Sequence, residues 1–241
     1  MNFRCVQCGY HIKTLYVQYS PGNIRLMKCQ NCKAVADEYI ECEIMILLID
    51  LILHKAKAYR HLFYNMFDRE SLNFEGLIWK LTFGYLLLDA YRISIIRTNE
   101  EGWGSDPSFA SLSWACGKIL LDAFLGNLLF FSILLLGTRS LLNMPVEVSG
   151  YKNILLAILA SSYLKTFLIA MMVWEFPSSV IFIIDIFVLS SNTLALKVMS
   201  EESVAMAKCF GVCLCAHIVK FLISLALNIH LPELITRLLT L

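Results

Sequence analysis

Charge is scarce in this 241-residue sequence, in which Asp, Glu, Lys and Arg make up only 16% of the residues, against about 25% in a typical soluble domain. Hydrophobic residues reach 58% and the mean hydropathy is +0.67, which disfavours an ordinary soluble enzyme. The formal net charge of +1 is not the basic surplus that nucleic-acid binding requires. With 11 Gly and 5 Pro, collagen-like and low-complexity disordered chains are also excluded. We therefore expect a mainly α-helical, multi-pass membrane protein that binds no nucleic acid.

A secretory signal peptide is also missing, because no apolar stretch precedes the first cysteine. We therefore expect the N-terminal region to face a reducing compartment, where clustered thiols are more typical of metal sites than of disulfides. The nine cysteines are unevenly distributed, and five of them fall in the first 42 residues: Cys5, Cys8, Cys29, Cys32 and Cys42.

The first four of these cysteines form two C-x2-C pairs separated by twenty residues, Cys5 with Cys8 and Cys29 with Cys32. Two residues between thiolates let both bind one tetrahedral zinc ion at ~2.3 Å. The intervening residues predict a strand, a turn and a second strand, so we expect a zinc ribbon over residues 1–35. Four cysteine ligands leave no position for an activated water, so the zinc is expected to be structural. The alternatives are a redox Cys-x-x-Cys pair, which usually has a βαβ context, or two disulfides.

Residues 36–70 are predicted to form an amphipathic helical segment. Acidic residues at 37–43 follow a stretch that is basic only, and a long helix over about 42–67 is expected to begin there. Its circumference is mostly apolar, which predicts that it lies in a membrane interface or packs into a bundle.

At 100° per residue this helix would align four polar side chains in a stripe about 60° wide: Asp50, His54, Lys57 and His61. The stripe favours a hydrogen-bonded polar seam; a second metal site, a lipid head-group contact or a proton relay are the alternatives. Three basic side chains beside it are candidate contacts for lipid phosphates: Lys55, Arg60 and Arg69.

Residues 71–241 form the predicted membrane region. Four apolar stretches have about the 20 residues that a helix needs to cross ~30 Å of hydrocarbon: 119–137, 154–174, 178–196 and 209–229. A fifth stretch, 77–96, is doubtful because it contains Lys80, Asp89 and Arg92, and each charge near mid-bilayer costs ~2.5–3.5 kcal/mol. We therefore expect four to five spans.

Two charges inside these stretches are candidates for an intramembrane ion pair. Lys165 and Asp185 flank the turn at Phe176, and at 1.5 Å per residue their depths differ by only ~3 Å. Pairing would lower the cost of burying both. His217 and Lys220 in the last stretch are rival partners for Asp185.

Ten of the twenty basic residues fall within positions 1–80, which favours a cytosolic N-terminal region. The sequence shows no G-x-S-x-G elbow, no P-loop and no histidine-rich catalytic pattern, so we expect no enzymatic activity.

The motifs of residues 1–67 resemble the homology domain of the Arv family, the ACAT-related proteins required for viability. The resemblance rests on Cys5-x-x-Cys8-Gly9, on Cys29-x-x-Cys32, and on the runs at 36–41 and 49–65. The short chain is similar to plant members. The resemblance implies residence in the endoplasmic reticulum and a role in sterol homeostasis, covering sterol uptake, trafficking and distribution to other membranes, with an influence on sphingolipid metabolism.

The expected function is therefore that of a non-enzymatic mediator of sterol homeostasis, with membrane lipids, above all sterol, as its partners. The alternative is a zinc-ribbon scaffold subunit that supports a lipid or glycosylphosphatidylinositol biosynthetic enzyme.

Overall fold

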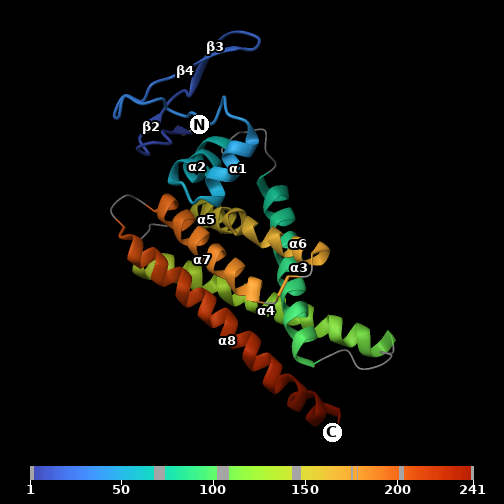
Figure 1. Ribbon diagram of the computed structural model, residues 1–241. Coiled ribbons are helices and arrows are strands. Elements are labelled where there is room, and N and C mark those ends of the chain that lie inside the picture. The colour runs from blue at the N-terminus through green and yellow to red at the C-terminus, as the bar shows by residue number, and fades with distance from the viewer. Residues whose placement is uncertain are drawn as a thin grey trace.

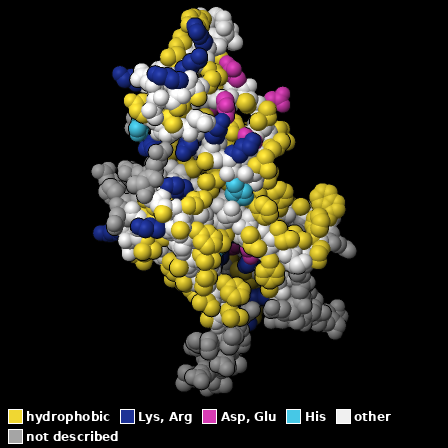
Figure 2. All heavy atoms as spheres, turned by 60° about the vertical axis from the view of Figure 1, so that its left-hand side comes forward, with side chains coloured by type: hydrophobic (Ala, Val, Ile, Leu, Met, Phe, Trp, Pro, Cys, Tyr) yellow, Lys and Arg dark blue, Asp and Glu magenta, His cyan; other side chains and the backbone are white. Residues whose placement is uncertain are grey.

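The computed structural model describes residues 3–67, 74–101, 109–142, 148–174, 176–177, 179–200 and 204–239. Short strands lie at one end of the molecule and long helices extend from them toward the C-terminus (Figure 1). Most of the acidic and basic side chains on the face in Figure 2 gather at the strand end, and apolar side chains dominate below them. The separation matches a polar head on a membrane-embedded bundle.

Residues 3–67 form the head, which contains two small antiparallel sheets. Strand β1 (Phe3–Arg4) pairs with β2 (His11–Ile12), and β3 (Tyr16–Ser20) pairs with β4 (Asn23–Leu26). Gly22, at φ +82°, makes the β3–β4 turn, because a residue without a Cβ adopts positive φ at little cost. The predicted strand–turn–strand is confirmed, while the sequence analysis did not predict the short β1–β2 pair.

The single helix expected over 42–67 is wrong, because the chain forms three short helices there: α1 (Ile44–Ile52), α2 (Ala56–Arg60) and the π-helix η1 (His61–Met66). His54 has a φ of +56°. The Lys55 amide bonds the Asp50 carbonyl at 2.9 Å, and the His54 amide bonds the Leu51 carbonyl at 3.0 Å. These two bonds form a Schellman motif, which ends α1 and satisfies its last carbonyls.

The described part of the membrane region forms five long helical segments, one of which continues into two short helices. They are α3 (Phe74–Glu101), α4 (Phe109–Leu141), α5 (Val148–Ser161) followed by the 3₁₀ turn η2 (Ser162–Thr166) and α6 (Phe167–Val173), α7 (Ser179–Met199) and α8 (Met206–Leu239).

Four stretches of these helices are long and apolar enough to cross a membrane: Leu112–Leu141, Gly150–Ala170, Ser179–Met199 and Met206–Leu227. Each overlaps one of the four predicted stretches. Helix α3, which contains the doubtful 77–96 stretch, is not among them.

Close packing of α4 against α8 and of α5 against α7 builds the bundle (Figure 1). A Cβ added to Gly137 on α4 would lie only 2.7 Å from Cγ1 of Val212 on α8, so this crossing depends on glycine. Phe130 and Leu134 of α4 are fully buried in the core between these helices.

A second core cluster joins the head to the bundle. Tyr59 of α2 is fully buried and packs in one cluster with Ala157 of α5 and Ala195 of α7. The hydroxyl of Tyr64 donates to the carbonyl of Val198 at 3.0 Å. The head is therefore attached to α5 and α7 by apolar packing and by hydrogen bonds.

Candidate functional site

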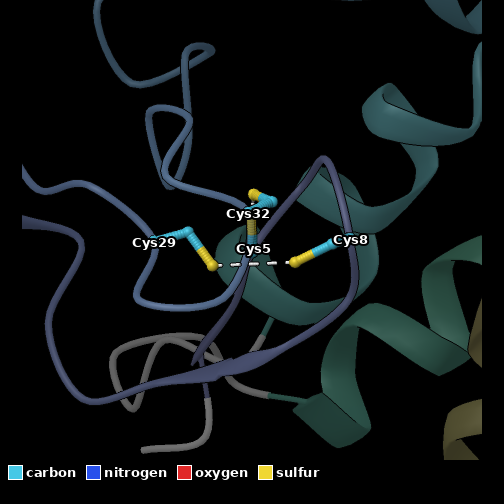
Figure 3. A group of neighbouring side chains, drawn as sticks. All are labelled: Cys5, Cys8, Cys29 and Cys32. Carbon is cyan, nitrogen blue, oxygen red and sulfur yellow. Dashed lines mark hydrogen bonds between the residues drawn. The ribbon is translucent and has the colours of Figure 1, made fainter.

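The four cysteines of the two C-x2-C pairs converge at one point in the head (Figure 3). The Sγ atoms of Cys5 and Cys32 are 3.7 Å apart, and those of Cys8 and Cys29 are 3.6 Å apart. All four Sγ atoms lie within 4.8 Å of one another. This arrangement is close enough to bind a metal ion through four sulfur atoms.

Each pair sits on a tight turn of the same design. The Gly9 amide bonds the Cys5 carbonyl at 2.8 Å, and the Lys33 amide bonds the Cys29 carbonyl at 3.1 Å. The residue after each second cysteine has positive φ, +74° at Gly9 and +62° at Lys33. Both turns thereby point their two thiols toward the same centre, although only the first has a glycine to relieve the strain.

The surroundings of Cys5 and of Cys29 shift the pKa values of the two thiols in opposite directions. Burial raises the pKa of the Cys5 thiol to about 12. At Cys29 burial acts in the same direction, but backbone N–H groups of Cys32 and Asn31 bond the sulfur and lower its pKa to about 7. Backbone donors that stabilise a thiolate are the usual outer partners of cysteine metal ligands.

The predicted alternatives fit this geometry less well. A disulfide needs an S–S distance of ~2.05 Å, and the four cysteines are free. The strands here form antiparallel hairpins and not the βαβ unit that usually carries a redox Cys-x-x-Cys pair. The donor set suits a soft or borderline metal ion bound by four thiolates.

Within the head, the buried carboxylate of Asp37 connects the chain that follows the cysteines to η1. Oδ2 of Asp37 lies 2.7 Å from Nδ1 of His61 and accepts a 2.6 Å bond from Nδ2 of Asn65. Asn65 also bonds both backbone groups of Arg4 at 3.0 Å. Asp37 and Asn65 were not predicted as site residues, because the bonds that join them to His61, to Arg4 and to each other span 24 to 61 positions and no local spacing rule connects them.

The polar stripe does not gather into a single site. Asp50 accepts a 2.8 Å bond from the Tyr39 hydroxyl, and Lys57 lies 3.1 Å from Glu38, whereas His54 stacks on Phe187 with ring centroids 6.0 Å apart. Hydrogen bonds from Lys55 and then from Tyr39 hold the pKa of Asp50 below its usual range. Within the described ranges, the four head cysteines are the only group of His, Cys, Asp and Glu side chains placed to hold a metal ion.

The basic residues predicted to meet lipid phosphates have other partners. Lys55 lies 2.7 Å from Asp50, with its side chain 52% exposed. Nη1 of Arg60 donates to the carbonyls of Val6 at 3.0 Å and Gln7 at 2.9 Å. Arg60 therefore holds the first cysteine turn on α2, and its contact with lipid phosphates stays a prediction. Arg69 lies outside the described residues.

The predicted ion pair between Lys165 and Asp185 is wrong. Nζ of Lys165 lies 2.6 Å from Oδ1 of Asp89, and Asp185 accepts bonds from Arg92, one of them from Nε at 3.1 Å. Asp89 and Arg92 belong to α3, which supplies a separate partner for each of the two charges that were expected to pair directly. The rival Lys220 also bonds Asp89.

Comparisons with known proteins identify a family and several relatives of this chain. The Arv1-like family profile matches residues 4–196. The chain is 51% identical to Protein ARV 1 of Arabidopsis thaliana over 223 residues, covering 92% of this chain and 87% of the relative. It is 51% identical to Protein ARV 2 of the same plant, covering 91% and 92%, and 31% identical to human Protein ARV1, covering 81% and 72%.

No solved structure matches the chain at a significant level. The family profile spans the cysteine head together with most of the bundle, and both plant relatives match over nearly their whole length. The chain therefore belongs to the Arv1-like family.

Proposed function

We propose that this protein is a non-enzymatic mediator of sterol homeostasis in the membrane of the endoplasmic reticulum, where it acts in sterol uptake, trafficking and distribution to other membranes. Through sterol it would also influence sphingolipid metabolism. The observation that carries the proposal is the family match over residues 4–196, which includes the head and most of the bundle.

The proposal includes one structural zinc ion on Cys5, Cys8, Cys29 and Cys32. A tetrahedron with Zn–S bonds of ~2.3 Å has S–S edges of ~3.8 Å, and two sulfur pairs lie 3.7 and 3.6 Å apart. A zinc ion would supply a cross-link between the two turns and contribute folding free energy to a head too small to bury a core of its own. Four thiolates leave no open position for a reacting water, which supports a role in structure and not in catalysis.

Arg60 and Tyr59 of α2 connect the first cysteine turn to the membrane region. Arg60 holds the first cysteine turn through two carbonyls, and the Tyr59 hydroxyl lies 2.7 Å from Oγ of Ser191 on α7. In the proposed arrangement the head lies in the cytosol, because half of the basic residues fall in positions 1–80. Sterol would lie against the exposed apolar side chains of the spans, where buried apolar area supplies most of the affinity.

The test of sterol capture uses the full-length protein in nanodiscs and a photoreactive, radiolabelled cholesterol. Saturable labelling that unlabelled cholesterol displaces is the expected result. Cholesterol acetate, which lacks the free hydroxyl, serves as the competitor that distinguishes a specific site from general partition. Labelling that rises linearly with the probe and is not displaced by cholesterol would contradict direct sterol binding.

A second candidate function is that of a scaffold for a lipid or glycosylphosphatidylinositol biosynthetic enzyme. It is favoured by aromatic side chains that strand β3 exposes, Tyr16 at 39% and Tyr19 at 65%, because exposed aromatic residues are enriched at protein interfaces. Stoichiometric co-purification of such an enzyme with the wild-type protein, lost in a Tyr16→Ser/Tyr19→Ser variant, would support this function. Co-purification that the double substitution leaves unchanged would exclude β3 as the docking surface.

A further inference from the structure

The charges buried where α3, η2 and α8 meet do not balance. Asp89 on α3 is 1% exposed, and its two carboxylate oxygens bond two different lysines. Oδ1 lies 2.6 Å from Nζ of Lys165 on η2, and Oδ2 bonds Nζ of Lys220 on α8. Two ammonium groups therefore share one carboxylate, so the cluster of Asp89, Lys165 and Lys220 has a formal charge of +1.

Neighbouring ion pairs do not supply the missing negative charge. Arg92 pairs with Asp185 and Arg97 pairs with Asp122, one to one in each case. Across the ranges that the structure describes, neither lysine of the cluster has a second carboxylate within ion-pair distance. A surplus charge in such surroundings is costly unless a counter-ion is bound.

The nearby imidazole does not supply the missing negative charge. Nε2 of His217 lies 3.4 Å from Nδ2 of Asn192. An imidazole side chain is either neutral or positively charged, so His217 cannot balance the surplus on the two lysines.

Two buried donors at the cluster have no hydrogen-bond partner in the described part of the chain, Nδ2 of Asn127 and the hydroxyl of Tyr85. Asn127 is 7% exposed, and its Oδ1 already accepts a 2.6 Å bond from Nζ of Lys220. Tyr85 is 5% exposed, and the centroid of its ring is 3.8 Å from Nζ of Lys165. A positive surplus beside unused N–H and O–H donors is suited to an anionic oxygen ligand.

Part of the cluster reaches the surface of the bundle, because the side chain of Lys220 is 13% exposed. Acidic and basic side chains are visible between apolar side chains in the membrane half of the molecule (Figure 2). Large apolar side chains are exposed on three of the four elements that contribute to the cluster: Phe83 on α3, Leu128 on α4 and Phe221 on α8. A ligand with one anionic group and long apolar chains would match both the positively charged cluster and the apolar side chains around it.

We propose that Asp89, Lys165 and Lys220, together with Asn127 and Tyr85, form an intramembrane site for a singly charged phosphate group, supplied by the phosphodiester head group of a membrane lipid. One negative charge neutralises the cluster, and phosphate oxygens accept bonds from Nδ2 of Asn127 and the Tyr85 hydroxyl. The site goes beyond the proposed sterol role, because sterol has no anionic group.

The charge balance is tested by Asn127→Asp in the full-length protein in neutral detergent without added lipid. This change keeps the oxygen that accepts from Lys220 and places the missing negative charge inside the cluster. The midpoint of thermal unfolding is expected to rise by at least ~2 °C, while Asn153→Asp on the exposed face of α5 leaves it unchanged. A lower midpoint for Asn127→Asp would show that the cluster was already balanced and would overturn the proposal.

Binding is tested with dioleoyl-phosphatidylglycerol, a phosphodiester with one charge, and with dioleoylglycerol, which has no phosphate. Native mass spectrometry is expected to show about one phosphatidylglycerol per wild-type chain and at least tenfold less on Asn127→Asp and Lys220→Met. Lys208→Met, on an exposed position of the same helix, is the matched control and should bind like the wild type.

The source of the phosphate is resolved by adding inorganic phosphate. Stabilisation by phosphatidylglycerol but not by inorganic phosphate supports the lipid head group. Stabilisation by inorganic phosphate alone supports the phosphate site and replaces its lipid source by the free ion. Equal binding of dioleoylglycerol, or wild-type binding by Lys220→Met, would overturn the proposal, and neither result depends on whether sterol is bound.

Discussion

At the scale of single residues, Asp37 connects three segments of the head through its carboxylate. It is fully buried, and besides His61 and Asn65 its Oδ1 accepts the backbone N–H of Tyr39 at 3.0 Å. A buried carboxylate that bonds three partners holds all three in place, because each partner would lose a hydrogen bond if the carboxylate were replaced. Asp37 thereby fixes the helix that contains Asn65 against the strand that precedes Cys5.

Replacing Asp37 with Asn should loosen the head without removing its cysteines. One amide oxygen cannot replace a carboxylate among three donors, and leaving buried donors unsatisfied costs roughly 1–3 kcal/mol each. Hydrogen exchange of residues 3–12 should accelerate in Asp37→Asn, while Glu41→Gln at an exposed position should leave exchange as in the wild type. Unchanged exchange in Asp37→Asn would mean that the carboxylate contributes little to the docking.

Replacing Cys29 with Ser should release the proposed zinc and unfold the ribbon while the spans stay inserted. A structural zinc site contributes an apparent ~10–16 kcal/mol to comparable small modules, so three remaining thiols would not hold the head folded. Elemental analysis should find about one zinc per wild-type chain and much less in the variant. Cys42→Ser, whose thiol bonds the Glu38 carbonyl outside the cluster, should retain the metal.

At the scale of elements, the local signals predicted the hairpin and the spans but not the break after α1. C-x2-C spacing and runs of 19–21 apolar residues depend on neighbours in sequence, so they can be recognised without a structure. His54 gives no such signal, because the positive φ that ends α1 is adopted most readily by glycine. The regular spacing of Asp50, His54, Lys57 and His61 therefore predicted one continuous helix where the chain turns.

The crossing of α4 and α8 provides a prediction at this scale. Gly137→Ala should push the helices apart, since the new Cβ would lie 2.7 Å from Val212, and overpacking of this kind costs about 1–3 kcal/mol. The midpoint of thermal unfolding in detergent should fall, and Val212→Ala in the same chain should recover part of the loss. Gly117→Ala, where nothing lies within 4 Å, is the matched control and should be neutral or slightly stabilising.

At the scale of the whole molecule, α3 joins the bundle of the four apolar helices through ion pairs with them. Its charges reach three other elements: Asp89 bonds η2 and α8, and Arg92 bonds α7. A helix with these charges is expensive in lipid but is accommodated where Asp89, Arg92 and Arg97 meet side chains of opposite charge. The pair of Lys165 and Asp185 was predicted wrongly, because the comparison of depths considered two adjacent helices and not a third helix, α3, that supplies a partner to each.

The contribution of the Arg92–Asp185 pair to the stability of the bundle can be measured by removing one of its two charges and then both. Asp185→Leu leaves Arg92 without its carboxylate, and breaking an ion pair withdrawn from water costs more than removing it entirely. Since the two side chains are 18% and 29% exposed, we expect a loss of about 1–3 kcal/mol for the single change, below the range for fully buried pairs. Arg92→Leu/Asp185→Leu should recover most of the folded fraction in size-exclusion chromatography. A double variant that behaves as badly as Asp185→Leu alone would show that α3 is held by apolar packing, because only a mutual charge interaction makes the second loss compensate for the first.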